Sequence, residues 1–69
     1  MTENLNLLRI DEVSQRVKFT RAWIFRLEKQ GRFPQRVKLG PNRVCWLERE
    51  IDSWIMKKVR QRERRRVRL

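Results

Sequence analysis

Apolar side chains in the N-terminal part of the chain recur at helical spacing. In the run LLRIDEVSQRV, Ile10, Val13 and Val17 stand three and four positions apart, which places them on one face of a short helix. Asp11 falls at the start of this helix, where it can act as the N-cap or lie in the first turn, near the positive end of the helix dipole. The preceding Leu7–Leu8 pair is expected to form an extended lead-in.

A second helical segment follows after a very short connection. The run from Thr20 to Gly31 begins with a hydroxyl residue suited to the N-cap and ends at a glycine suited to the left-handed position that follows a helix. Ile24 and Leu27 share one face of this helix and are expected to pack inward. Because only the dipeptide 18–19 separates the two helices, they must turn sharply across each other, as in a helix-turn-helix.

The opposite face of the second helix combines basic and aromatic side chains. A helix that enters the DNA major groove needs a small residue near its N-terminus for close approach, an arginine that can bind O6 and N7 of guanine, and a basic residue for phosphate. An ordinary solvated basic face would have a similar composition, although exposed aromatic side chains are unusual there. The predicted DNA contacts on this helix are Thr20, Arg21, Ala22, Trp23, Phe25, Arg26 and Lys29.

The period of the pattern changes after the second helix. Two short alternating runs, RVKLG and RVCWL, flank a Gly-Pro-Asn turn and predict a β-hairpin. Its buried face is expected to hold Val37, Leu39, Val44 and Trp46, and its outward side chains are expected to be Arg36, Lys38 and Arg43. A hairpin after a helix-turn-helix is typical of a wing, so Lys38 and Arg43 are predicted to contact a phosphate strand or the minor groove. Charges that merely solvate an exposed sheet face remain an equal alternative.

A third helix is predicted from about Glu48 to at least Val59. Its acidic residues cluster at the positive end of the helix dipole and its basic residues at the negative end. Together these elements predict an α+β fold, a small winged helix-turn-helix made of a helix-turn-helix, a two-stranded β-hairpin wing and a C-terminal helix. Its expected core comprises Ile10, Val13, Ile24, Leu27, Phe33, Val37, Leu39, Val44, Trp46, Ile51, Trp54 and Ile55.

Charge is distributed unevenly along the chain. The 69 residues carry a formal net charge of +11, of which residues 57–69 hold +7. We therefore divide the chain into a flexible lead-in (1–6), a DNA-binding domain (7–59) and a basic tail (60–69) that forms a frayed helical extension.

Arginine-rich segments neutralise phosphates and release counterions, so nucleic acid is the favoured partner of the tail. A solubilising tail, or one attracted to RNA or membranes, has the same composition. The predicted phosphate contacts of the tail are Arg62, Arg64, Arg65 and Arg66.

The same composition argues against enzymatic and membrane functions. The sequence has no histidine, one cysteine and scattered carboxylates, so we expect no catalytic residues, no metal site, no cofactor and no small-molecule ligand. Cys45 is expected to be an inert thiol on the outer face of the hairpin, and the Trp46–Trp54 pair to fill the core rather than to clamp a cofactor. Because the apolar runs are short and the N-terminus is acidic, neither a membrane span nor a signal peptide is expected, and the protein is predicted to be cytoplasmic.

Three segments of the sequence resemble a known family. The segments LLRIDEVSQRV, FTRAWIFRLEKQGRFPQRVKLG and VCWLEREIDSWI are similar to the AlpA family of phage- and mobile-element-encoded regulators, which resemble winged-helix excisionases and MerR-type DNA-binding domains. The resemblance covers roughly residues 7–56. It implies a DNA-binding protein of a prophage or integrative element, with the second helix as recognition helix and the hairpin as wing.

The chain departs from the family pattern at a few positions. Lys18 stands where such sequences usually have glycine, so either this lysine takes a left-handed conformation with a Cβ penalty or the turn differs. Trp23 replaces a small hydroxyl residue and is a candidate to cover the core edge. Pro41-Asn42-Arg43 at the wing tip shifts the usual arginine by one position.

Several functional hypotheses are compatible with this sequence. The first is sequence-specific binding of double-stranded DNA, by a transcriptional activator that contacts RNA polymerase, by an excisionase that bends an attachment site for a phage-type integrase, or by both. We expect a monomer in solution that associates cooperatively on DNA, because no heptad repeat provides a dimerisation coil. The second is a protein-interaction module, such as an anti-activator that docks its basic surface on an acidic protein, with only non-specific nucleic-acid binding. Single-stranded RNA binding through Trp23 and Phe25 is a further alternative.

Overall fold

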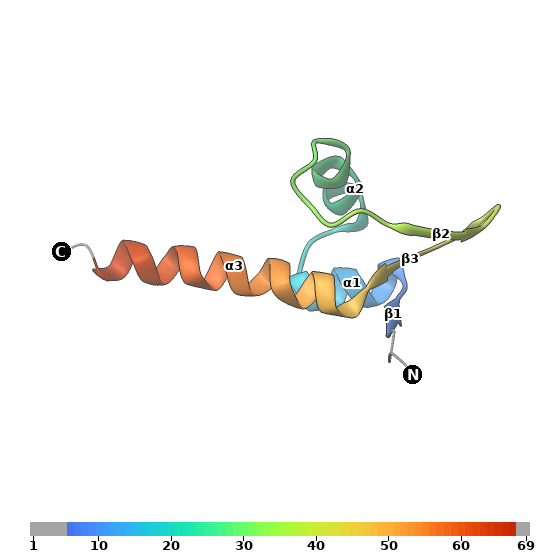
Figure 1. Cartoon of the computed structure of the whole chain (residues 1–69). Helices are drawn as coiled ribbons and strands as arrows, with labels where there is room; N and C mark the ends of the chain where they lie inside the picture. The colour runs from blue at the N-terminus through green and yellow to red at the C-terminus, as the bar shows by residue number, and fades with distance from the viewer. Residues whose placement is uncertain (1–5, 68–69) are drawn as a thin grey trace.

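The computed structural model describes the backbone of residues 6–67 and the side chains of residues 6–63. Three helices and a small antiparallel sheet make an α+β fold, which is consistent with the predicted winged helix-turn-helix (Figure 1). The elements in chain order are β1 (Leu7–Leu8), α1 (Ile10–Val17), α2 (Arg21–Lys29), β2 (Val37–Gly40), β3 (Arg43–Leu47) and α3 (Glu48–Val67).

The start of α1 is fixed by a residue of its first turn. The backbone N–H of Arg9 donates to Oε1 of Glu12 at 2.8 Å, so Arg9 is the N-cap and the helix begins at Ile10. Asp11 lies in the first turn, where its charge suits the helix dipole, and is not the N-cap. The sequence predicted Asp11 either as the N-cap or in the first turn, and the first turn is correct.

Both ends of α2 carry the predicted caps. The hydroxyl of Thr20 accepts a hydrogen bond from the backbone N–H of Trp23 at 3.2 Å, which confirms Thr20 as N-cap. After the helix, Gly31 has φ of +74°, and the N–H of Arg32 donates to the carbonyl of Leu27 at 2.9 Å. This bonding pattern is a Schellman motif, in which glycine takes the left-handed position.

The turn between α1 and α2 is held in a left-handed conformation. Lys18 has φ of +62° and donates its N–H to the carbonyl of Ser14 at 2.8 Å. The hydroxyl of Ser14 also donates to the carbonyl of Phe19, which ties the turn back to α1. Of the two alternatives stated for Lys18 from the family resemblance, the left-handed conformation with its Cβ penalty is therefore correct.

The sheet has three strands rather than two, in the order β1-β3-β2. The predicted extended lead-in is a short strand that pairs antiparallel with β3, placing Leu8 opposite Trp46. Directly opposite residues of antiparallel strands point to the same face, so Leu8 and Trp46 share the buried face of the sheet. Leu8 is thus a core residue that the sequence pattern did not identify.

The predicted buried face of the hairpin is wrong for β2. Val37 pairs with Cys45 and Lys38 pairs with Val44, so Val37 lies on the face opposite to Val44 and Trp46. The register then shifts between Lys38 and Gly40, and the extra residue at this bulge, Leu39, is 53% exposed. Cys45 is half-buried on the side that faces away from Trp46.

The core is smaller than the predicted one, and most of its members were expected. Ile10, Val44, Trp54 and Ile55 are only partly buried and pack around its edge, and Val37 is also half-buried. Trp46 and Trp54 donate their indole N–H groups to the carbonyls of Pro34 and Arg32, each at 3.0 Å, which satisfies the polar atom of each ring. The buried apolar residues in the described part of the chain are Leu8, Val13, Ile24, Leu27, Phe33, Trp46 and Ile51.

Helix α3 begins directly after β3 and continues to Val67, beyond the predicted minimum of Val59. Near its start, Arg16 of α1 forms ion pairs with Glu48 and Asp52, and the N–H of Glu48 donates to the carbonyl of Asn6 at 2.9 Å. The rest of α3 extends away from the other elements (Figure 1). None of the helices in the described part of the chain is long and apolar enough to cross a membrane.

Candidate nucleic-acid interface

The outer face of α2 is exposed and basic, as the helical wheel predicts. Ile24 and Leu27 are buried, whereas Ala22, Arg26 and Lys29 are exposed on the other side of the helix. Ala22 adds no bulk near the N-terminus of α2, so a DNA groove could approach the backbone closely there. The face therefore presents a small residue followed by two cations along one helix.

The two exposed aromatic residues of α2 lie on its two flanks. Trp23 is 41% exposed and packs edge-on against Phe19 with ring centroids 6.4 Å apart. The guanidinium of Arg26 lies 5.6 Å from the centroid of the Trp23 ring, a cation–π contact that holds Arg26 beside the outer face. Phe25 is 36% exposed on the other flank and contacts Trp46.

Arg21 is less available than the sequence implied. Its guanidinium forms an ion pair with Asp11 of α1, across the helix-turn-helix crossing. Both side chains are more than half exposed, so water screens the pair strongly and a phosphate could displace the carboxylate. Arg21 is thus placed for a backbone contact at the N-terminus of α2, in competition with Asp11.

A buried carboxylate links α2 to Arg36, the residue before β2, and the sequence pattern did not identify this link. Glu28 is 5% exposed, and its carboxylate accepts hydrogen bonds from the backbone N–H of Arg36 at 2.7 Å and from Nε of Arg36 at 3.0 Å. The hydrogen bond to Glu28 raises the pKa of Arg36 above its already high ordinary value. The guanidinium is therefore charged throughout the ordinary pH range.

Arg36 also stacks on the aromatic flank of α2. Its guanidinium carbon lies 5.0 Å from the Phe25 ring centroid and 6.0 Å from that of Trp46. The predicted outward position of Arg36 is thus wrong, because the one-residue difference in strand register places it on the same face as Trp46. A signal for this link was present in the sequence, since Glu28 stands four residues after Ile24 on the apolar face of α2.

The wing presents its two predicted cations to solvent. Lys38 and Arg43 are both exposed, and Arg43 pairs with Gly40 to close the turn at Pro41-Asn42. The hairpin extends from the molecule on the side opposite to the free end of α3 (Figure 1). The chain therefore offers cations at three separate places, which are the outer face of α2, the wing and α3.

Of the predicted tail contacts, only Arg62 lies among the described side chains. It is exposed on α3, 63% accessible, with Glu63 4.0 Å away. Arg64, Arg65 and Arg66 lie outside the residues whose side chains the structure describes. Within the described part of the chain, no three His, Cys, Asp or Glu side chains are grouped so that they could hold a metal ion.

Comparison with known proteins identifies the family. A family model described as Prophage CP4-57 regulatory protein (AlpA) matches residues 6–59. The chain is also similar to a protein of Enterobacteria phage P4, described as Uncharacterized protein ORF88, with 35% identity over 57 residues. That alignment covers 83% of this chain and 65% of the phage P4 protein, so it spans just under two thirds of the relative's length. No solved structure matches the chain. Since the family model spans both helices of the helix-turn-helix, the wing and the first part of α3, the chain belongs to the AlpA family of prophage regulatory proteins.

Proposed function

We propose that this protein binds double-stranded DNA in a sequence-specific manner, with α2 in the major groove. The observation that carries the proposal is the outer face of α2, on which Ala22, Arg26 and Lys29 are exposed directly after a helix-turn-helix crossing. Membership of a family of phage regulatory proteins supports the same function. A role on the DNA of a prophage or integrative element would place the protein in the cytoplasm.

The residues proposed to contact DNA act in two ways. Arg26 is suited to read a guanine edge, while Arg21, Lys29, Lys38 and Arg43 are suited to neutralise phosphates. Thr20, Ala22, Trp23 and Phe25 would shape the approach of α2 to the groove. The tail would add sequence-independent contacts through Arg62, Arg64, Arg65 and Arg66.

The test of specificity is an Arg26→Ala variant on fragments of the neighbouring DNA, with random duplex as competitor. We expect wild-type protein to leave a footprint that resists competitor, and Arg26→Ala to weaken binding by about 1–3 kcal/mol and relax the preference at one base pair. Arg49→Ala is the matched control, since it removes the same charge from an exposed position on α3. Equal effects of the two substitutions would show that charge alone drives binding.

Within DNA binding, the position of the footprint separates two regulatory roles. A single site upstream of a promoter would indicate a transcriptional activator that contacts RNA polymerase. Phased adjacent sites within an attachment site, with altered mobility of bent DNA, would indicate an excisionase that assists a phage-type integrase. We propose an AlpA-like regulator that performs one or both of these roles.

We further propose that the protein is a monomer in solution and associates cooperatively on DNA. The exposed surface of the recognition helix and wing carries cations, which oppose self-association in the absence of DNA. Sedimentation at micromolar concentration is expected to give a single species near the chain mass of 8.7 kDa. A stable free dimer would contradict this part of the proposal.

A further inference from the structure

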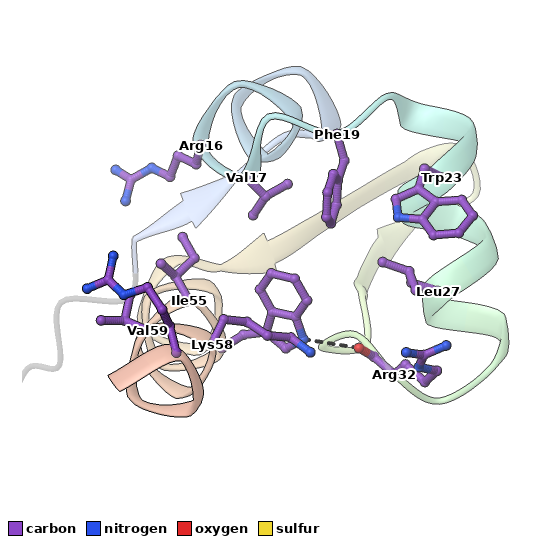
Figure 2. Close-up of a pocket in the computed structure, with 11 residues that line it drawn as sticks. Arg16, Val17, Phe19, Trp23, Leu27, Arg32, Ile55, Lys58 and Val59 are labelled. Atoms are coloured by element: carbon purple, nitrogen blue, oxygen red, sulfur yellow. Dashed lines mark hydrogen bonds between the residues drawn. The ribbon is translucent and has the colours of Figure 1, made fainter. Parts of the chain in front are cut away.

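A groove between the helix-turn-helix and α3 has an apolar floor that no element of the described chain covers. It has a volume of about 560 Å³. Figure 2 shows Val17, Phe19 and Leu27 directed toward a space that faces α3, with Trp23 at one edge. Its apolar floor is formed by Val17, Phe19, Leu27, Trp54, Ile55 and Val59.

The described rim of this groove is cationic. Arg32, Lys58 and Arg62 line it, and none of the eleven described residues that line the groove is acidic. A fourth cation, Arg16, is already paired with Glu48 and Asp52. Lys58 and Arg62 lie four residues apart on α3, so they stand one above the other on the same helix face. Glu63 lies 4.0 Å from Arg62, at the limit of an ion pair between two exposed side chains. An incoming group would therefore meet apolar side chains flanked by a net positive charge.

The two indole rings of the groove are already in contact with cations and with neighbouring rings. Nζ of Lys58 lies 5.2 Å from the centroid of Trp54, and the guanidinium of Arg26 lies 5.6 Å from that of Trp23. Trp54 also makes edge contacts with Phe19 and Phe33, at 6.2 and 4.9 Å between ring centroids. Base stacking needs a free aromatic face, and each of these indoles has a cation over one face of its ring, for which a base would have to compete.

We propose that this groove binds an amphipathic helix of a partner protein, with apolar side chains in the groove and Asp or Glu residues against Lys58 and Arg62. An exposed apolar patch with a polar rim is typical of a protein-binding surface. A helix in a groove offers apolar anchors at three- and four-residue spacing, and carboxylates at the same spacing would meet the two cations on α3. The charge of the rim selects an acidic partner over a basic one.

Among the described side chains, this site shares only Trp23 and Arg62 with the proposed DNA interface. Trp23 is the only groove residue on the exposed faces of α2, and the wing residues Lys38 and Arg43 do not line the groove. One molecule could therefore hold DNA on the outer face of α2 and an acidic helix beside α3 at the same time. Such an arrangement would let the protein recruit a partner to the DNA site that it occupies.

The experiment selects ligands from a random 16-residue peptide library displayed on phage, using the full chain as bait in the absence of DNA. We expect enriched peptides to combine Leu, Ile, Phe or Trp at positions i, i+3 or i+4, and i+7 with flanking Asp or Glu. Binding of a synthetic copy is then followed by tryptophan fluorescence, because Trp23 and Trp54 line the groove while Trp46 is fully buried.

Two double variants with the same change in charge distinguish binding in the groove from general electrostatic attraction to the protein. Lys58→Glu with Arg62→Glu reverses the rim, whereas Lys57→Glu with Arg60→Glu reverses two exposed α3 residues that do not line this groove. We expect the rim variant to bind the selected peptide at least about tenfold more weakly than the control variant, since two attractive pairs become repulsive. Thermal unfolding of both variants checks that the fold is intact.

Three outcomes of the selection and of the variant comparison would overturn the proposal, and a competition experiment gives a fourth. They are a selection that enriches no peptide, enriched peptides without paired apolar and acidic positions, and a selected peptide that both double variants bind equally. Displacement of the peptide by single-stranded oligothymidine would also overturn it, because the groove would then bind nucleic acid. None of these results would alter the footprint test of duplex binding, so the two proposals fail independently.

Discussion

At the scale of single residues, the turn of the helix-turn-helix stores backbone strain. Lys18 has φ of +62°, a region in which an L residue with a Cβ is disfavoured by about 1 kcal/mol or more. Lys18 is also exposed and its N–H bond to Ser14 does not depend on its side chain. The strain therefore belongs to the position and would be relieved by glycine.

We predict that Lys18→Gly raises the free energy of unfolding by about 0.5–1 kcal/mol, after the extra entropy that glycine gains in the unfolded chain is allowed for. Urea unfolding followed by circular dichroism measures this change. Lys18→Ala is the control, since it removes the charge but keeps the Cβ and should not stabilise. An equal gain in both variants would show that charge, rather than backbone conformation, is the cause.

The link between Glu28 and Arg36 is a second residue-scale feature with a measurable effect. Glu28 is buried, and replacing its carboxylate by an amide in Glu28→Gln leaves Arg36 without its anionic partner. We predict a loss of about 1–3 kcal/mol in the free energy of unfolding, toward the lower value because the Arg36 side chain is 42% exposed. Glu50→Gln removes an exposed carboxylate and should change stability by less than about 0.5 kcal/mol.

At the scale of elements, local signals define the helices better than they define the sheet. Thr20 and Gly31 bound α2 because their capping roles depend on nearby backbone groups. The pairing of β2 with β3 depends on a register that alternation alone does not specify, and the bulge at Leu39 changes it by one residue. The sequence pattern therefore predicted the hairpin but assigned Val37 and Leu39 to the wrong face.

The same distinction applies to the candidate site. The outer face of α2 follows from helical periodicity, so the exposed positions of Ala22, Arg26 and Lys29 could be predicted. The pairing of Arg21 with Asp11 and the stacking of Arg36 on Phe25 depend on how separate elements cross. These contacts need the three-dimensional arrangement, because no spacing along the chain specifies them.

The arrangement of the sheet can be tested with two leucines. The sequence pattern predicted that Leu39 is a core residue and that Leu8 is not, which is the opposite of what the structure shows. Leu8 of β1 is buried against the core, whereas Leu39 at the bulge is exposed. We predict that Leu8→Ala lowers the free energy of unfolding by about 2–4 kcal/mol and that Leu39→Ala changes it by less than about 0.5 kcal/mol. Chemical denaturation of both variants gives the comparison. A larger loss for Leu39→Ala would contradict the observed register.

At the scale of the whole molecule, positive charge and buried surface lie in different places. The core joins α1, α2, the sheet and the first turns of α3, up to Ile55. Of the described side chains beyond Val59, residues 60–63 are all exposed. Since residues 57–69 hold +7 of the net charge of +11, the segment that contributes least to the core carries most of the charge.

This separation predicts that removal of residues 60–69 changes binding to DNA more than it changes folding. The thermal unfolding of the shortened chain should match that of the full chain, because no described side chain beyond Val59 is buried. If Arg62, Arg64, Arg65 and Arg66 each contact a phosphate, the slope of log K against log salt should fall by roughly three to four units in magnitude. The ratio of affinities for the footprinted site and for random duplex should persist, since phosphate contacts carry no base information. Filter binding or fluorescence anisotropy over a range of salt concentrations measures both quantities. A slope equal to that of the full chain would mean that the tail does not contact DNA, and a lost affinity ratio would mean that it helps to read sequence.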